Sequence, residues 1–234
     1  MNLTFSDDKP IILCGDHHGD YQAVISLLKK NQITDCYLIH VGDGGEGFTL
    51  NTEKQHREFA YYNDIFKHKN IVYCSIRGNH SNPYYFRSGL VNLDNFKLLE
   101  DYSTISYKNK TIQLIGGAVS IDRSIRKSGR DYWEDEVIEF DRAKCKKVDV
   151  LITHTAPTWS FPYGCTSDIV KMWCNRDSSL FKEIVHERLI MEEIVNCCEP
   201  SLLAYGHFHV SHIDKIRNCV CKALAINELW ELRI

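Results

Sequence analysis

Five short, mostly apolar runs in this chain are each followed within one or two residues by glycine, aspartate, asparagine or histidine. The runs have the length and composition of buried strands, and the polar residues stand where each strand would end. In open α/β sheets, ligands bind at the carboxyl ends of the strands. We therefore expect the polar clusters to share one site. They are Asp16-x-His18 after residues 11–14, Gly42-Asp43 after 38–41, Gly78-Asn79-His80 after 71–76, His154 after 148–153, and Gly206-His207-x-His209 after 202–205.

The residue types in these clusters suit a pair of divalent metal ions. Two neighbouring cations need neutral imidazoles, carboxylates, and at least one carboxylate that contacts both ions. The five clusters together contain all three. A single Gly-Asp or Asn-His pair is common in loops, so the prediction depends on the ordered set.

Between the clusters, the pattern alternates strand and helix. A helix is expected after Asp20, a plausible N-cap, and others at about 53–67, 134–147 and 178–198, the last with Phe181 pointing inward. Two β-rich runs at 103–107 and 111–115 predict a hairpin, and a last strand pair is expected at 211–216 and 220–226. Residues 228–234 suit either a strand or a helix.

In order and spacing, the clusters resemble those of the calcineurin-like metallophosphoesterases, whose pattern reads D-x-H, G-D-x-x-D, G-N-H-D/E, H, G-H-x-H. The resemblance runs from about Ile11 to His209. It implies an α/β fold with two packed mixed β-sheets flanked by helices, the αββα sandwich of this superfamily. It also implies the ligand assignment: Asp16, His18 and His209 bind one ion, Asn79, His154 and His207 bind the other, and Asp43 bridges them.

The same resemblance implies an enzyme, a metal-dependent hydrolase of phosphomonoesters or phosphodiesters in which a metal-bridging hydroxide attacks phosphorus. Asp43 and His80 are then the catalytic residues. His80 ligates neither ion in the pattern, so it is the candidate general acid that protonates the leaving-group oxygen. For the two divalent ions we expect manganese, while iron, nickel and zinc also accept this mixture of ligands.

Two positions depart from the family pattern. After Asp43 the chain has Gly44-Gly45-Glu46, where many relatives have an acid followed by arginine, and this argues against a protein-phosphatase activity. Ser81 replaces the acid that usually orients the histidine before it. The partner of His80 is therefore left open.

Three arginines are candidates for gripping substrate phosphate: Arg77, which precedes the Gly78 cluster, and Arg123 and Arg126 in a short basic segment. The alternative for the basic segment is a solvated surface loop. Residues 158–175 are rich in aromatic side chains and follow His154 closely. They suit a lid or base-stacking wall, and equally a satellite hydrophobic cluster under a loop.

Composition limits the partners. A chain of 234 residues with 44% hydrophobic content can bury one sizeable core, so a single domain over 1–234 is expected. A net charge of -3 gives no general attraction to nucleic acid or to an anionic membrane. The N-terminus lacks a signal-peptide pattern and no apolar run reaches about 20 residues, so we expect a soluble cytoplasmic protein. The ten cysteines are widely spread and are expected to be mostly reduced core residues.

Three functions fit these features. The first is a phosphoesterase for a phosphorylated small molecule, a nucleotide or another phosphoester. The second is a nuclease acting on DNA or RNA, which is not favoured by the acidic balance but could use the basic patch at 123–130. The third is a catalytically inactive scaffold that binds a protein partner, which would be expected to have lost ligands. The oligomeric state is not predicted.

Overall fold

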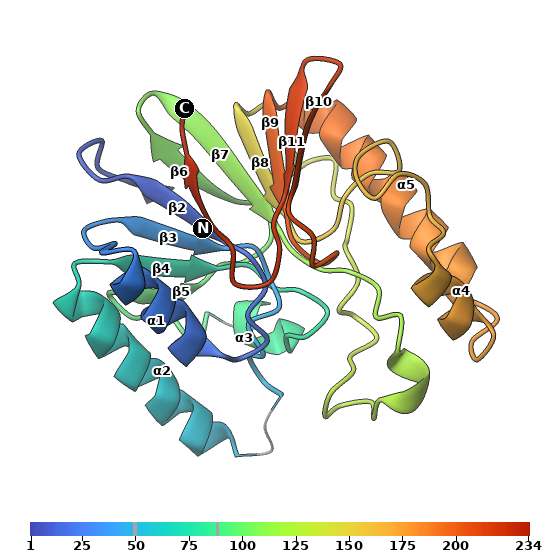
Figure 1. Cartoon of the computed structure of the whole chain (residues 1–234), viewed down its shortest axis with the longest axis horizontal. Helices are drawn as coiled ribbons and strands as arrows, with labels where there is room; N and C mark the ends of the chain where they lie inside the picture. The colour runs from blue at the N-terminus through green and yellow to red at the C-terminus, as the bar shows by residue number, and fades with distance from the viewer. Residues whose placement is uncertain (49–50, 88) are drawn as a thin grey trace.

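Two mixed β-sheets pack face to face in the computed structural model, which describes residues 1–48, 51–87 and 89–234 (Figure 1). The first sheet has the order β12-β2-β3-β4-β5, with β2 to β5 parallel and β12 antiparallel to β2. Its strands are β12 (Leu229–Leu232), β2 (Ile11–Cys14), β3 (Tyr37–His40), β4 (Val72–Ser75) and β5 (Phe96–Leu98).

The second sheet has seven strands in the order β1-β6-β7-β8-β9-β11-β10. Its centre is parallel from β7 to β11, while the hairpins β6-β7 and β10-β11 are antiparallel and β1 pairs in parallel with β6. The strands are β1 (Asn2–Thr4), β6 (Ser103–Tyr107), β7 (Lys110–Ile115), β8 (Val150–Thr153), β9 (Leu202–Tyr205), β11 (Cys219–Ala223) and β10 (His212–Ile216).

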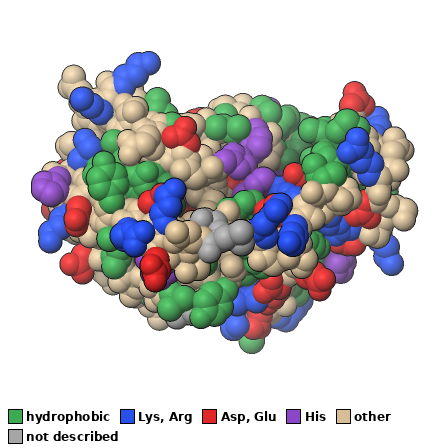
Figure 2. Space-filling view, turned by 90° about the horizontal axis from the view of Figure 1, so that it is seen from below, with side chains coloured by type: hydrophobic (Ala, Val, Ile, Leu, Met, Phe, Trp, Pro, Cys, Tyr) green, Lys and Arg blue, Asp and Glu red, His purple; other side chains and the backbone are tan. Residues whose placement is uncertain are grey.

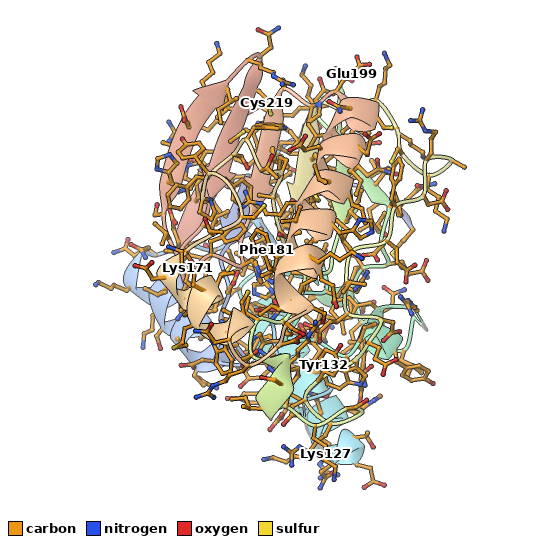
Figure 3. All side chains as sticks on the ribbon, turned by 90° about the vertical axis from the view of Figure 1, so that its right-hand side faces the viewer. Lys127, Tyr132, Lys171, Phe181, Glu199 and Cys219 are labelled. Carbon is orange, nitrogen blue, oxygen red and sulfur yellow. The ribbon has the colours of Figure 1, made fainter. Side chains whose placement is uncertain are left out.

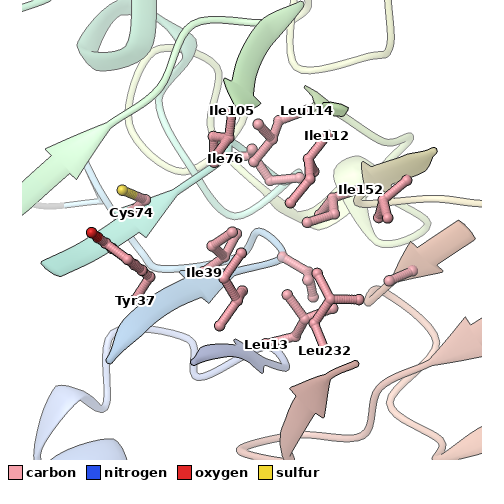
Figure 4. Close-up of a cluster of buried hydrophobic side chains, with 14 of the residues drawn as sticks. Leu13, Tyr37, Ile39, Cys74, Ile76, Ile105, Ile112, Leu114, Ile152 and Leu232 are labelled. Atoms are coloured by element: carbon pink, nitrogen blue, oxygen red, sulfur yellow. The ribbon is translucent and has the colours of Figure 1, made fainter. Parts of the chain in front are cut away.

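The core between the sheets explains why the central strands, such as β2 (Ile11–Cys14), are apolar. Leu13 and Ile39 from one sheet meet Ile112, Leu114 and Ile152 from the other, and all five are fully buried (Figure 4). Strands covered on both faces read as continuous apolar runs rather than as alternating patterns. The predicted pair of packed sheets is therefore confirmed.

Helices cover the outer faces of both sheets (Figure 1). α1 (Tyr21–Lys30) and α2 (Thr52–His68) share a buried cluster with the first sheet, in which Leu28 and Phe66 contact residues of β2 to β5. α5 (Leu180–Cys198) packs Met191 and Ile194 against the second sheet. The shorter helices are α3 (Pro83–Arg87), α4 (Asp168–Cys174) and the 3-10 turn η1 (Arg123–Ile125).

Most of the expected elements are confirmed. Asp20 caps α1 by accepting a 2.9 Å hydrogen bond from the backbone N–H of Ala23. The helices expected at 53–67 and 178–198, the hairpin at 103–115 and the last strand pair are also present, and residues 229–232 form a strand. Phe181, expected to point inward, is 44% exposed at the start of α5 (Figure 3).

The helix expected at 134–147 is wrong, because this segment is irregular. Many of its backbone groups are bound by side chains from distant parts of the chain, and its own backbone hydrogen bonds are limited to turns such as the one at Asp141. Arg77 donates to the carbonyl oxygens of residues 135–137, and Gln113 donates to that of Lys144 and accepts from the N–H of Lys146. The hydroxyl of Tyr102 binds the backbone at residues 139 and 141. Tertiary hydrogen bonds therefore override the local helical pattern.

Candidate metal centre

The ends of β2, β3 and β4 and of β8 and β9 bring the predicted ligands to one place. Four of these residues have left-handed backbone conformations, at φ 47° for His18, 63° for Asp43, 68° for His207 and 58° for His209. Non-glycine residues rarely adopt this region, and such strain clusters at functional sites. Histidine side chains accordingly gather near the middle of one face of the molecule (Figure 2).

Two overlapping groups of side chains have the spacing of metal ligands. The first is Asp16, His18, Asp43 and His209, and the second is Asp43, His154 and His207; within each group the ligand atoms lie within 4.8 Å of one another. In the first group, the Nε2 atoms of His18 and His209 are 3.0 Å apart, and His209 Nε2 is 3.3 Å from Asp16 Oδ2. Asp43 belongs to both groups.

The two oxygens of Asp43 point to different groups. Oδ2 is 3.9 Å from His18 Nδ1, whereas Oδ1 is 3.2 Å from His154 Nε2. The Asn79 side chain completes the second group: its Oδ1 is 3.2 Å from His154 Nε2 and 2.9 Å from His207 Nδ1. This arrangement suits a carboxylate that bridges two ions, with the amide oxygen as a neutral ligand to one of them.

A buried carboxylate oxygen without a partner supports metal binding. Asp16 Oδ1 is fully buried and has no hydrogen-bond partner among the described residues. Its partner oxygen, Oδ2, accepts from the backbone N–H of His207 at 2.9 Å. An ionised buried oxygen left alone costs much free energy, and a cation is the partner that removes this cost.

Contacts behind the ligands orient their donor atoms. His154 Nδ1 donates to the carbonyl oxygen of Val41 at 2.8 Å, which leaves Nε2 for the centre. Asn79 Nδ2 donates to Ser120 Oγ at 3.2 Å, which directs Oδ1 inward. Burial lowers the pKa of His154, but the Asp43 carboxylate outweighs it and raises this pKa to about 9. The carboxylates therefore attract positive charge to the centre, and the donor set of imidazoles, carboxylates and an amide fits divalent transition metals.

Two glycines make room for the ligands. A Cβ on Gly78 would lie 2.1 Å from Asp43 Oδ1, and one on Gly206 would lie 2.1 Å from Asp16 Oδ1. Both distances are far shorter than real contacts between these atoms. Any larger residue at either position would displace a carboxylate ligand.

His80 lies beside this centre, and its closest side-chain partner is Arg126. The backbone N–H of His80 donates to Asp43 Oδ1 at 2.7 Å, and its ring stacks on Phe48 with centroids 5.4 Å apart. Arg126 Nη2 is 2.6 Å from His80 Nε2. Because a guanidinium only donates, Nε2 accepts here and His80 is neutral. Burial lowers the pKa of His80 to about 4. The Asp43 carboxylate opposes this shift, and the charge of Arg126 adds to it.

The two departures from the family pattern contact each other. Ser81 Oγ donates to Glu46 Oε2 at 2.8 Å, and the Tyr21 hydroxyl donates to Glu46 Oε1 at 3.2 Å. Glu46 is fully buried, and burial raises its pKa to about 7. A buried acid thus binds the serine that stands where relatives have an acid after the histidine. The paired departures were the available sequence signal, but sequence alone did not connect them.

The structure argues against direct substrate contact by Arg77. Its side chain is 1% exposed and pairs with Asp101 at 2.8 Å while it binds backbone carbonyls. Its guanidinium therefore holds the irregular segment and is not available to a ligand.

Arg123 and Arg126 have different positions. Arg123 pairs with Asp177 at 2.7 Å and with Glu183, so it fastens η1 to the start of α5. That engagement also argues against the predicted substrate contact by Arg123. Arg126 lines the cavity beside the centre and is the arginine of the three that reaches His80.

A cavity of about 520 Å³ opens beside the candidate centre. Asp43, Asn79 and His207 line it on the side of the centre, and residues 161–167, 169 and 170 together with Trp173 also line it. The predicted aromatic segment therefore forms both a wall of this cavity and, through Val170 and Trp173, part of a satellite hydrophobic cluster with α5. The hydrophobic cluster expected from the sequence is therefore present, whereas a lid or base-stacking role for this segment stays a prediction.

This fold and donor set define a metallophosphoesterase architecture. The family model for calcineurin-like phosphoesterases matches residues 9–211, well over half of the chain. The chain therefore belongs to the calcineurin-like phosphoesterase family.

Other comparisons add little. No curated protein matches the sequence. A solved structure described as "GAP50 the anchor in the inner membrane complex of Plasmodium" is similar at 12% identity and a TM-score of 0.47, covering 93% of this chain and 71% of that chain. A likeness of this size has no bearing on what this chain binds. None of the helices within the described ranges is long and apolar enough to cross a membrane.

Proposed function

We propose that the protein is a metal-dependent phosphoesterase that hydrolyses a phosphomonoester or phosphodiester of a small molecule or nucleotide. The observation that carries this proposal is the convergence of six other candidate ligand side chains around Asp43, whose two oxygens face different ligand groups. Asp16, His18 and His209 would hold one ion, Asn79, His154 and His207 the other, and Asp43 both. The ions would supply neutralisation of phosphate charge and activation of water. Manganese is the expected metal.

We further propose that Arg126 binds the substrate phosphate. It lies at the junction of the cavity and the centre, and its side chain is 7% exposed. A phosphate oxygen is a stronger acceptor for a guanidinium than a neutral imidazole nitrogen is. Phosphate binding would therefore draw Arg126 away from His80 Nε2.

His80 is the proposed general acid. Its release from Arg126 would free Nε2 to carry a proton for the leaving-group oxygen, and the nearby Asp43 favours the protonated ring. In this proposal the two side chains act in order: Arg126 takes the phosphate first, and His80 protonates the departing oxygen afterwards.

The first test is metal binding and turnover by Asp43→Asn. With manganese, nickel or zinc, the wild-type protein should bind two ions and hydrolyse p-nitrophenyl phosphate or bis-p-nitrophenyl phosphate. The variant should lose the second ion and turnover, while the exposed control Asp94→Asn should retain both. Full activity with two ions in Asp43→Asn would refute the bridging role. Wild-type protein that binds two ions but hydrolyses neither ester under any metal would favour the inactive scaffold.

The second test separates the roles of His80 and Arg126. His80→Ala should slow esters with poor leaving groups most and p-nitrophenyl esters least, because only the former need protonation. Arg126→Ala should raise KM for both kinds. An equal loss for both kinds in His80→Ala would mean that His80 positions phosphate instead.

A further inference from the structure

The cavity beside the candidate centre is lined mostly by apolar side chains from three parts of the chain, together with polar residues such as Thr166 and Ser167. Val119 follows β7, Val170 and Trp173 belong to α4, and Ile184 belongs to α5. These side chains form one hydrophobic cluster around the cavity. Its volume of about 520 Å³ lies within the range of cavities that enclose a small organic ligand.

The charged side chains that line the walls away from the ligand cluster are already engaged. Arg188 is 2% exposed and donates to the backbone carbonyl oxygens of residues 156, 157, 160, 162 and 164. Glu187 accepts from the backbone N–H of Val119 and from Thr155 Oγ1. Asp122 pairs with Arg126 at 2.7 Å. Within the described residues, these walls therefore present no unpaired charge to a ligand.

This lining discriminates between ligands by chemistry. A sugar or a nucleobase would bring several hydrogen-bonding groups into the cavity, and each group left unpaired there costs free energy. An alkyl or aryl group brings none and gains from leaving water. Candidate ligands, among them Asp43, Asn79 and His207, line part of the cavity, so a single molecule can place its phosphate at the centre and an apolar group in the cavity.

We propose that the substrate is a phosphoester of an apolar alcohol, whose hydrocarbon part fills this cavity while its phosphate lies at the metal centre. The proposal rests on the proposed function for the position of the phosphate. It adds the class of the organic group and assigns its binding to Val119, Val170, Trp173 and Ile184.

A series of n-alkyl phosphates from ethyl to octyl tests it with the metal-loaded protein. The leaving alcohols have nearly equal acidity, so the chemical step is held constant while the apolar area grows. Each methylene buried in the cavity should raise kcat/KM about threefold to fourfold, until the cavity is filled. The matching alkylphosphonates, which cannot be hydrolysed at the carbon–phosphorus bond, should gain affinity by the same factor, measured by calorimetry and by the change in tryptophan fluorescence.

Variants on α4 test whether the alkyl group of the substrate binds in the cavity. In Val170→Trp, kcat/KM should stop rising at a shorter alkyl length than in the wild type. In Val170→Ala it should continue to rise to a longer alkyl length. Met172→Trp adds the same bulk on the same helix, but Met172 is 50% exposed and does not line the cavity, so it should behave as wild type. If either Val170→Trp or Val170→Ala fails to fold, the other variant still tests whether the alkyl group lies in the cavity.

The outcomes separate this inference from the proposed function. Hydrolysis of every ester with no dependence on chain length would overturn the inference and leave the phosphoesterase proposal standing. Affinity for alkylphosphonates that grows with length, without hydrolysis of any ester, would support the cavity assignment and refute the enzyme. If kcat/KM stopped rising at the same alkyl length in Val170→Trp and Met172→Trp, the inference would also be overturned.

Discussion

Replacement of Glu187 by glutamine should change how the stability of the protein depends on pH. Glu187 is 4% exposed on α5, and burial raises its pKa from 4.5 to about 7, against the opposing hydrogen bonds from Thr155 and Val119. When the pKa of a carboxyl group is higher in the folded state than in the unfolded state, its contribution to stability is fully present at pH values below the unfolded-state pKa. This contribution is lost as the pH rises through the folded-state pKa. Glutamine keeps an acceptor for Val119 and cannot ionise.

The magnitude follows from the two pKa values. Between about pH 5 and about pH 8, ionisation of Glu187 should lower the free energy of unfolding of the wild-type protein by roughly 2 to 3 kcal/mol relative to Glu187→Gln. The free energy of unfolding of Glu187→Gln should therefore increase relative to that of the wild type as the pH rises, whatever the difference between them is at low pH.

Urea unfolding at several pH values measures this, with a chelator present so that metal binding does not add its own pH dependence. Glu193→Gln on the same helix is the control, because Glu193 is exposed and its replacement should leave the pH profile unchanged. A constant difference between Glu187→Gln and the wild type across this range, or a difference that grows in the opposite direction, would refute the assignment of a buried acid that is neutral at low pH.

Three further predictions concern the ligands and the cavity wall. Gly206→Ala places a Cβ 2.1 Å from Asp16 Oδ1, so it should cost at least one equivalent of bound metal by elemental analysis; two retained equivalents would contradict this. Arg188→Lys should lose most of the hydrogen bonds to residues 156–164 and lower the free energy of unfolding by roughly 2 to 4 kcal/mol in urea, and a loss below about 1 kcal/mol would show that the loop does not depend on them. Metal added at about 100 times its Kd should raise the free energy of unfolding of the metal-free protein by about 3 kcal/mol, as measured by thermal unfolding. An increase of equal size in Asp43→Asn would argue against binding at this centre.

Much of the fold and the candidate centre could be predicted from sequence, because the signals are local. The run at 11–14 is apolar at every position and that at 37–40 is apolar up to His40, as expected for strands buried on both faces, and the polar residues that follow these runs mark one sheet edge. The ligand types likewise restrict the chemistry to divalent metals wherever they converge. The convergence follows from the parallel order of the strands, which the alternation of strand and helix already indicates.

Where the structure departs from what the sequence suggested, the physical origin is the same. Substrate contact by Arg77 and Arg123 stays a prediction, but the guanidinium of Arg77 binds a carboxylate and backbone carbonyls, and that of Arg123 binds two carboxylates, all far away in sequence. The segment 134–147 has a helical pattern, but in the folded structure Arg77 and Gln113 bind backbone groups that a helix would use for its own hydrogen bonds. A basic residue in a sequence does not reveal which distant acceptor holds it.

The sequence by itself determined the strand runs, the identity of the candidate ligands and the metal chemistry they suit, since these depend on residue type and short-range order. Only the tertiary structure decided that Glu46 lies against Ser81, that Arg126 holds His80, and that α4 and α5 enclose an apolar cavity. Each of these contacts joins side chains many residues apart, and its energy depends on burial that exists only after the two sheets and their helices have packed.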